Sequence, residues 1–343
     1  MQDRIRVSRL ISKHHLYHPA YKEALDNSKD YQSLLHYLHT LDPYSRYMTP
    51  DHVEFLETRE GEFRIDIGLD YLISNDQILV VPSPGGSAES VGLLSPAWLV
   101  SIEGNALEYA DFSTYRFLTE LEPGEKLQVV TRRPDENVVS SYLIPAQLRY
   151  RQLVMDFDLG DFGVIRIDRF KSGMGDKIAA SIKKFSQKKR LIIDLRYNPG
   201  GDLFSAVDYL SLLMPKDLVV AYIKKHQQGP LLTLRSLSGN LLTQDRLLYV
   251  LVSRYTASSA EIFTQALKIN RPNTLVVGEP TKGKCLASER LKLPDGSALE
   301  LVTHEVVGAD GMACEGRPLV PDKLIPDIAF QSLSDVLDEL SDM

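Results

Sequence analysis

LLYVLVSRYTASSAEI, residues 247–262, is the stretch that decides the fold. Its first six residues are all apolar, which is typical of a strand buried on both faces of a sheet. The residues from 259 to 270 instead predict a helix. A strand that passes through a short turn into a helix is half of a strand–helix–strand unit, so we expect a parallel sheet with covering helices. Ser258 would then lie in the turn, directly before the helix.

The same alternation continues on both sides of this stretch. Further strands are expected at 162–167, 190–195 and 274–277, and further helices at 174–184 and 203–213. Two strand patterns at 286–293 and 298–307, joined by Pro294-Asp295-Gly296, predict a β-hairpin. Residues 134–343 are therefore predicted to form a mixed α/β core.

Two regions of different character precede this core. Residues 61–133 combine about five short strands with two short helices, at 87–93 and 112–121, and predict a separate small domain. We place its end close to the polar turn at 135–137. Residues 1–60 predict a helical N-terminal arm, most clearly at 31–41.

Composition limits the classes of function. The 343 residues suffice for about two domains, and a net charge of −7 argues against nucleic acid as a partner. No apolar run is long enough to cross a bilayer. The N-terminus lacks the apolar segment of a secretion signal, so we expect either a cytosolic protein or a missing leader. Two cysteines exclude a four-cysteine zinc site and leave room for one disulfide.

One stretch imitates a nucleotide-binding loop. GEPTKGK, residues 278–284, fits the pattern Gly-x4-Gly-Lys after a strand. Cys285 stands where that loop needs a hydroxyl for Mg²⁺, and a strand pattern follows instead of a helix that could bind phosphate. His304-Glu305 begins like a zinc motif but lacks its second histidine. An NTPase and a metal enzyme are therefore minor alternatives.

Several motifs taken together indicate a different class of protein. TASSAEI at 256–262 is similar to SASASEI, and VGEPTKGK at 277–284 to VGExTxGKG, two motifs of the carboxyl-terminal processing peptidases, which are S41-type Ser/Lys proteases. LDPYSRYMTP at 41–50, LIIDLRYNPGGD at 191–202 and GRPLVPD at 316–322 resemble further segments of that family, in the same order. The resemblance covers nearly the whole chain. It implies a PDZ domain at 61–133 and a peptidase core at 134–343.

The resemblance also implies catalytic roles. Ser258 aligns with the nucleophile and Lys284 with the general base. Burial can lower a lysine pKa by several units, so that a neutral amine accepts the serine proton. The amides of Ser259 and of Gly200 or Gly201 would bind the oxyanion, since they lie at a helix N-terminus and a glycine turn. Such a mechanism requires no metal and no other cofactor.

The sequence departs from the family pattern near the lysine. Ser288 stands four residues after Lys284, where the family has a glutamine that orients the ammonium, and Tyr255 replaces a glycine. Cys285 follows the lysine directly, and Cys314 lies in the closing segment. We expect these cysteines to approach and form a disulfide that locks or distorts the lysine loop, the alternative being two reduced, packed thiols. A catalytically weak or inactive peptide-binding protein is the alternative function.

A substrate site follows from the same resemblance. The amides of Ile67, Gly68 and Leu69 would capture the C-terminus of a substrate, which adds as a strand to a PDZ domain that gates the active site. The side-chain pocket would come from Leu69 and residues 112–121. Trp98 is expected either in the core of the PDZ domain, because tryptophan is highly buried on average, or facing the gate to the active site.

The resemblance further implies substrates with accessible apolar C-terminal tails, an activator or adaptor, and homo-oligomer contacts through the arm and residues 325–343. It implies a periplasmic or otherwise extracytoplasmic location, with the cytoplasm as the alternative.

Overall fold

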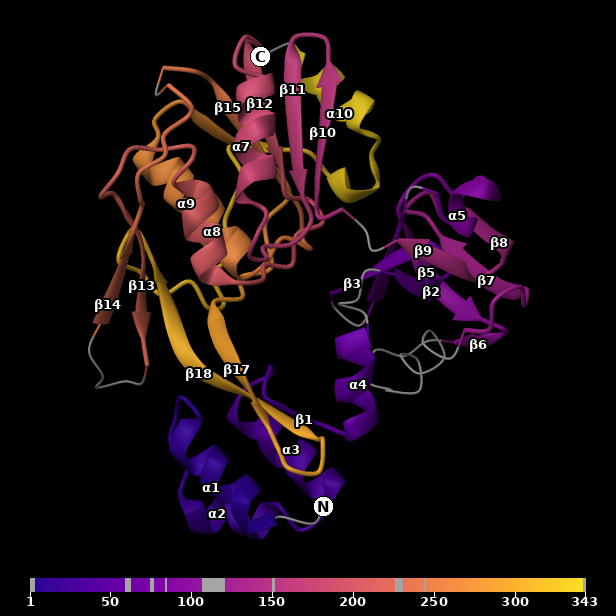
Figure 1. Ribbon diagram of the computed structural model, residues 1–343, viewed down its shortest axis with the longest axis vertical. Coiled ribbons are helices and arrows are strands. Elements are labelled where there is room, and N and C mark those ends of the chain that lie inside the picture. The colour runs from indigo at the N-terminus through magenta and orange to yellow at the C-terminus, as the bar shows by residue number, and fades with distance from the viewer. Residues whose placement is uncertain are drawn as a thin grey trace.

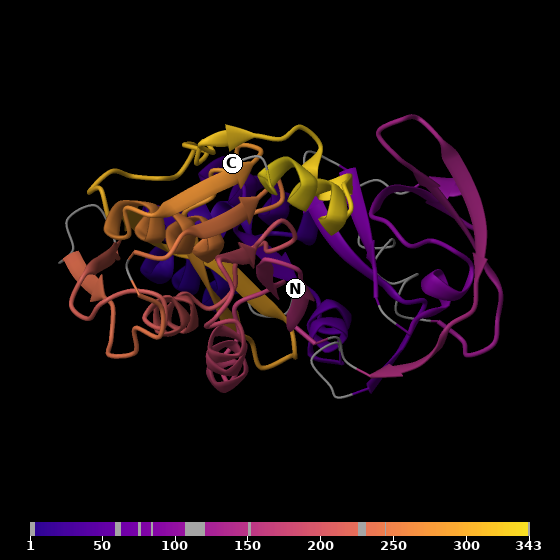
Figure 2. The same cartoon turned by 90° about the horizontal axis from the view of Figure 1, so that it is seen from above.

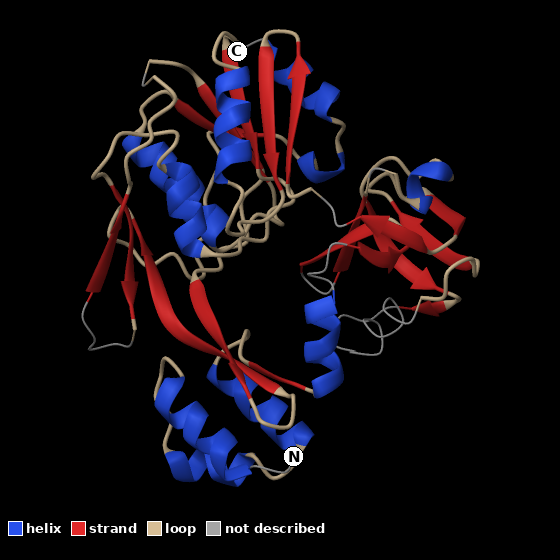
Figure 3. Ribbon diagram, viewed as in Figure 1, coloured by secondary structure: helices blue, strands red, loops and turns tan. Residues whose placement is uncertain are grey.

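Three parts make up the molecule: a helical arm, a small β-rich domain and a larger α/β core (Figure 1). The structure, a computed structural model, describes residues 4–58, 63–74, 77–83, 85–106, 121–149, 152–225, 231–243 and 245–341. The fold is mixed α/β, as expected (Figure 3).

A six-stranded sheet forms the centre of the core, in the order β10–β11–β12–β15–β16–β19. The strands are β10 (Val154–Leu159), β11 (Phe162–Ile167), β12 (Arg190–Asp194), β15 (Leu248–Val252), β16 (Thr274–Gly278) and β19 (Lys323–Leu324), all parallel except β10. Alternate side chains of each strand point to opposite faces, so both faces need cover. Helices α7 (Gly175–Lys184), α8 (Leu203–Leu210) and α9 (Ser259–Asn270) cover one face, and α10 (Leu333–Ser341) covers the other.

A second sheet connects the core to the arm. The hairpin β17 (Leu286–Lys292) and β18 (Ala298–Gly308) extends away from the core, and β18 also pairs with β13 (Val219–Lys224), which carries β14 (Leu231–Arg235). At its far end β18 pairs with β1 (Arg46–Met48). Helices α1 (Arg4–His14), α2 (Tyr21–Asn27) and α3 (Tyr31–Leu41) pack their apolar residues against the hairpin (Figure 1). The arm therefore adds strand β1 to this sheet and packs its helices against the hairpin.

The small domain follows helix α4 (Pro50–Thr58) and lies beside the core (Figures 1 and 2). Its sheet has the order β3 (Leu69–Ser74), β4 (Gln77–Pro82), β5 (Ala97–Ile102), β7 (Leu127–Arg132) and β8 (Val138–Leu143), with β6 (Asn105–Ala106) beside β5. Strands β2 (Phe63–Asp66) and β9 (Ala146–Arg149) form a separate pair, and α5 (Ser87–Ser90) is a single turn. Residues 135–137 are the turn of the β7–β8 hairpin. Strand β8, which lies beyond the boundary expected near residue 133, therefore belongs to the same sheet as β7.

The strands and helices expected in the core are confirmed, including the β17–β18 hairpin. Residues 112–120 of one expected helix lie outside the described residues. Trp98 is half-buried between the small domain and the core, so it lies outside the core of the small domain. Its Nε1 donates to the Tyr255 hydroxyl at 3.2 Å, and its ring centroid lies 4.8 Å from that of Phe330. This contact joins the small domain to the turn that precedes Ser258.

Candidate active site

Ser258 ends the turn between β15 and α9 and is half-buried. Its backbone has φ 58° and ψ −127°, a conformation that side chains other than glycine rarely adopt. Its amide donates to Glu261 Oε2 at 2.9 Å, which helps to hold this geometry. A strained residue of this kind typically marks a functional site and costs roughly 1–3 kcal/mol.

The glycine turn after β12 lies directly against Ser258. A Cβ on Gly200, where φ is 104°, would be 2.7 Å from the Ser258 Cβ and 3.2 Å from its Oγ. A Cβ on Gly201 would be 2.1 Å from the carbonyl oxygen of Phe170. Only glycine therefore fits at either position without a shift of backbone.

The three amides expected to bind an oxyanion differ in their hydrogen bonding. The Gly200 amide donates to Asn198 Oδ1 at 2.8 Å and is thus already used. Within the described part of the chain, the Gly201 and Ser259 amides donate no hydrogen bond. Gly201 and Ser259 therefore remain as the candidate donors.

One cleft of about 1130 Å³ brings most of the expected residues together. It runs from β3 of the small domain to the core and the base of β17. Residues that line it include Asp70, Tyr71 and Leu72 from β3, with Gly201, Ser258, Ser259, Lys284, Ser288 and Glu300 from the core.

Lys284 ends the loop that leads from β16 into β17. Its Nζ lies 4.4 Å from the centroid of the Tyr44 ring, which the end of the arm supplies. Among described residues, this ammonium makes no hydrogen bond or ion pair. Burial lowers the pKa of Lys284, against an opposing effect of the Glu300 carboxylate. A buried lysine without a close anion is suited to lose its proton.

Glu261 on α9 connects the Ser258 turn to the lysine loop. Its Oε2 accepts hydrogen bonds from the amides of Ser258 and Lys284, both at 2.9 Å. Its Oε1 accepts from the Gly283 amide at 2.7 Å and from the Thr281 hydroxyl. Burial raises the pKa of Glu261, and these hydrogen bonds oppose that rise. The sequence interpretation missed this residue, although Ser-x-x-Glu before an apolar run is the signature of a capping box.

A disulfide joins Cys285 to Cys314, with the Cα atoms 5.5 Å apart. The next residue, Glu315, uses Oε2 to accept from the Cys285 amide at 2.6 Å and from the amide after it at 3.1 Å. Its Oε1 accepts from the Tyr44 hydroxyl at 2.8 Å. The disulfide, Glu315 and Tyr44 thus link the closing segment and the arm to the loop that carries Lys284.

Ser288 lies on β17 and lines the cleft, but it does not bind the lysine. Its hydroxyl donates to Glu300 Oε1 at 3.2 Å. Glu300 Oε2 in turn pairs with the Arg46 guanidinium at 2.7 Å. Lys284 therefore lacks the direct orienting partner that the resemblance implied at position 288.

The loop expected to bind a substrate C-terminus is bonded internally. Asp66 Oδ1 accepts from the Gly68 amide at 2.7 Å and from the Leu69 amide at 3.2 Å. The Gly68 carbonyl accepts from the Ser83 amide, and Ile67 and Leu69 are fully buried. Two of the three amides assigned to this site are thus already used by a side chain of the same loop.

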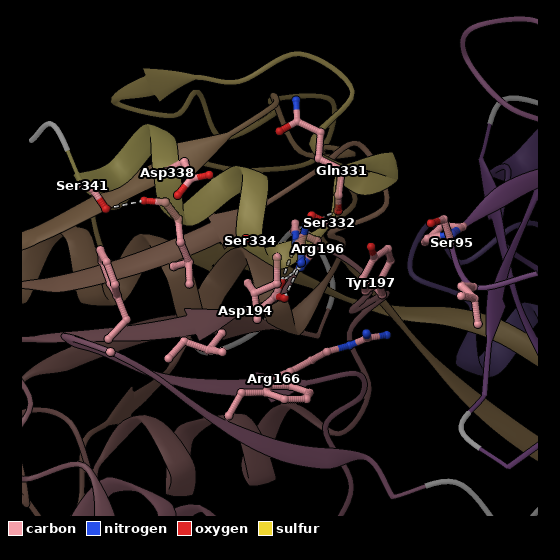
Figure 4. Close-up of a pocket in the computed structure, with 18 of the residues that line it drawn as sticks. Ser95, Arg166, Asp194, Arg196, Tyr197, Gln331, Ser332, Ser334, Asp338 and Ser341 are labelled. Carbon is pink, nitrogen blue, oxygen red and sulfur yellow. Dashed lines mark hydrogen bonds and ion pairs between the residues drawn. The ribbon is translucent and has the colours of Figure 1, made fainter. Parts of the chain in front are cut away.

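A second cavity of about 990 Å³ lies between the small domain, the central sheet and α10 (Figure 4). Asp194 and Arg196 meet there in a buried ion pair at 2.9 Å, and Arg196 also donates to the Ile328 carbonyl at 2.9 Å. These contacts confirm the prediction of a structural ion pair. They connect β12 to the segment before α10.

The alternatives in the sequence were a nucleotide-binding loop and a metal site. The loop that resembles a nucleotide-binding motif leads into strand β17, so it offers phosphate no helix N-terminus. Its Cys285 is in a disulfide. In the ranges that the structure describes, no three His, Cys, Asp or Glu residues gather as a metal site. The described helices also include none long and apolar enough to span a bilayer.

Comparison with known proteins shows which proteins the chain is similar to. Residues 161–328 match the model of Peptidase family S41. The chain is 28% identical over 300 residues to a probable CtpA-like serine protease of Staphylococcus aureus, and 24% identical over 301 residues to one of Staphylococcus haemolyticus. Each alignment covers 85% of this chain, which spans 59% of the length of these relatives.

Solved structures agree on the fold. The photosystem II D1 C-terminal processing protease superposes with a TM-score of 0.74 at 20% identity, over 95% of this chain and 94% of that one. A putative S41 protease from Bacteroides fragilis gives a TM-score of 0.61 at 18% identity, over 98% and 97%. The arrangement of arm, small domain and core is therefore an S41 protease fold.

Proposed function

We propose that this protein is a serine endopeptidase in which Ser258 is the nucleophile and Lys284 the general base. The observation that carries the proposal is the shared cleft, in which a strained serine and a buried lysine are fixed by one carboxylate. The match of residues 161–328 to the model of Peptidase family S41 supports it. Strained backbone residues cluster at functional sites, which is consistent with a preorganised nucleophile.

The chemistry is acyl transfer in two steps. Neutral Lys284 accepts the proton of Ser258 Oγ as this oxygen attacks the scissile carbonyl, and the amides of Gly201 and Ser259 bind the oxyanion. The ammonium then protonates the leaving amine, which frees the new N-terminus and leaves an acyl ester on Ser258. Water hydrolyses the ester with Lys284 again as the base. The proposed proton transfer requires Nζ to come within hydrogen-bonding distance of Oγ.

The direct test is cleavage of an unfolded protein by the wild type and by single variants. Ser258→Ala and Lys284→Ala should each abolish cleavage. Lys282→Ala is the matched control, because this exposed lysine lies on the same loop and has no catalytic role in the proposal. Equal cleavage by Ser258→Ala and the wild type would contradict the proposal.

We further propose that the small domain is a PDZ domain that controls access to the cleft. Support comes from β3, whose residues line the cleft, and from the Trp98–Tyr255 hydrogen bond three residues before Ser258. A shift of the small domain would therefore displace Tyr255 and with it the turn that ends at Ser258. Tyr255→Phe should change cleavage rates without unfolding the core, and an unchanged rate would exclude this route of control.

We also propose that Cys285 and Cys314 regulate the enzyme by oxidation. The disulfide keeps Glu315 against the lysine loop and Tyr44, so the oxidised form is the active one. A disulfide persists in oxidising compartments, which supports a periplasmic or other extracytoplasmic location. Cell fractionation with antibody detection tests the location.

A peptide-binding protein without turnover is the second candidate. Two observations favour it: Ser288 bonds to Glu300 instead of the lysine, and Lys284 Nζ makes no hydrogen bond to Ser258. In that case the wild type would bind peptides and cleave none, with or without reductant.

A further inference from the structure

Asp66 stands inside the loop that, in a PDZ domain, would hold the carboxylate of a peptide C-terminus. The residue is 5% exposed, and its side-chain Oδ1 accepts hydrogen bonds from two successive amides, those of Gly68 and Leu69. A carboxylate oxygen of the chain itself thus occupies the position that a ligand carboxylate would need.

The loop is also closed from outside. The Gly68 Cα lies so near Gly86 that a Cβ built on Gly68 would be 2.6 Å from the Gly86 Cα. The Ile67 carbonyl accepts from the Ala88 amide at 3.2 Å, and the Gly68 carbonyl from Ser83 at 2.9 Å. A terminal carboxylate could therefore gain the two amides only by displacing Asp66 from a buried, packed loop.

Strand β3, which follows this loop, offers a different kind of binding site, a sheet edge. Among the described strands, β3 ends the sheet and pairs only with β4, so its outer edge can accept an added strand. Asp70, Tyr71 and Leu72 of this strand line the same cleft as Ser258. Strand addition uses main-chain hydrogen bonds that any extended polypeptide can supply, whether or not it ends there.

We propose that Asp66 makes the small domain indifferent to a terminal carboxylate, so that it captures internal, extended segments of unfolded polypeptides along β3. This inference rests on the proposed function for its substrate. It replaces the expectation that Ile67, Gly68 and Leu69 select substrates by their C-termini. Asp66 is thus a specificity residue that acts by filling the loop, and it takes no part in catalysis.

The test compares two peptides of identical apolar sequence, one with a free C-terminal carboxylate and one with a C-terminal amide. Binding to the Ser258→Ala protein is measured by fluorescence anisotropy, so that cleavage does not enter. The same comparison is made with Asp66→Gly and Asp66→Asn on this background. Asn keeps an oxygen acceptor for the two amides and is the matched control, whereas Gly empties the loop.

The expected result is equal affinity for the two peptides in the parent and in Asp66→Asn, and at least a tenfold preference for the carboxylate in Asp66→Gly. A tenfold carboxylate preference in the parent overturns the inference, as does binding of neither peptide. If Asp66→Gly does not fold, as a thermal melt would reveal, the comparison in the parent alone decides. Peptides bound by this protein but not cleaved by the wild type would instead contradict the proposed function and leave the inference standing.

Discussion

The backbone amides of Ser258 and Lys284 donate hydrogen bonds to the same oxygen atom, Glu261 Oε2, each at 2.9 Å. The two residues belong to different loops, one before α9 and one before β17. A single buried carboxylate therefore sets the relative position of the two loops.

Glu261→Ala should impair the proposed peptidase activity while leaving the side chains of Ser258 and Lys284 in place. It leaves three amides and a hydroxyl without their acceptor, so we expect a loss of about 2–4 kcal/mol in the free energy of unfolding. We also expect kcat to fall at least tenfold, because misplacing the loops separates base from nucleophile. Chemical denaturation and steady-state cleavage measure the two effects. Asp322→Ala, which removes an acceptor of the Val276 amide away from the cleft, is the control and should lower stability only.

Backbone strain at Ser258 predicts a trade between stability and activity. Ser258→Gly and Ser258→Ala both remove the hydroxyl and should both abolish cleavage. Only glycine relaxes at φ 58° and ψ −127°, so Ser258→Gly should be more stable than Ser258→Ala by about 1 kcal/mol. Thermal melts of the two variants give this difference. Equal melting temperatures would mean that the turn stores no strain.

Gly200→Ala should be far more harmful than an ordinary glycine substitution. The new Cβ would lie 2.7 Å from the Ser258 Cβ and 2.9 Å from the Ala257 carbonyl oxygen, so the nucleophile turn must move. We expect loss of cleavage and a destabilisation of about 3 kcal/mol or more. Gly173→Ala is the control, since φ is 86° there but nothing lies within 4 Å of the new Cβ. It should cost only about 1 kcal/mol and retain activity.

The lowered pKa of Lys284 predicts how activity depends on pH. Only neutral Lys284 accepts a proton, so kcat/KM should rise with pH through a midpoint below the value of about 10.4 for an exposed lysine. Between the folded and unfolded pKa values the unfolded chain binds more protons, so the free energy of unfolding should also rise with pH there. Glu300→Gln removes a charge that raises this pKa and should shift the midpoint of the rate profile downward. A midpoint near that of an exposed lysine would contradict a buried base.

Reduction of the Cys285–Cys314 disulfide should weaken both fold and function. The bond closes a loop with a sequence separation of 29, for which chain entropy gives about 3–4 kcal/mol of stability. Cys314→Ser leaves Glu315 in the chain but frees the closing segment, and we expect slower cleavage. Thermal melts and cleavage assays with and without dithiothreitol measure this. If reductant accelerates cleavage, the disulfide is an inhibitory lock instead.

The sequence predicted those core elements that form clear local patterns, such as the six apolar residues of 247–252, and it missed β10, β13, β14 and α10. It also selected Ser258 and Lys284, which the fold brings to one cleft. Contacts between distant segments left no local signal: Tyr44 bonds to Glu315 across 271 positions. The hydrogen bonds from the Gly68 and Leu69 amides to Asp66 were missed for another reason. They depend on the orientation of the Asp66 side chain, which a sequence pattern does not give.

The pairing of β1 with β18 has a consequence for biosynthesis. Arg46 leaves the ribosome 254 residues before Glu300, the partner of its strand register and of its guanidinium. The apolar faces of the arm helices meet Leu299 and Leu301 only after that hairpin has emerged. The apolar residues of the arm helices therefore stay partly exposed during most of translation. A chaperone that binds apolar helices of nascent chains could bind the arm in this period.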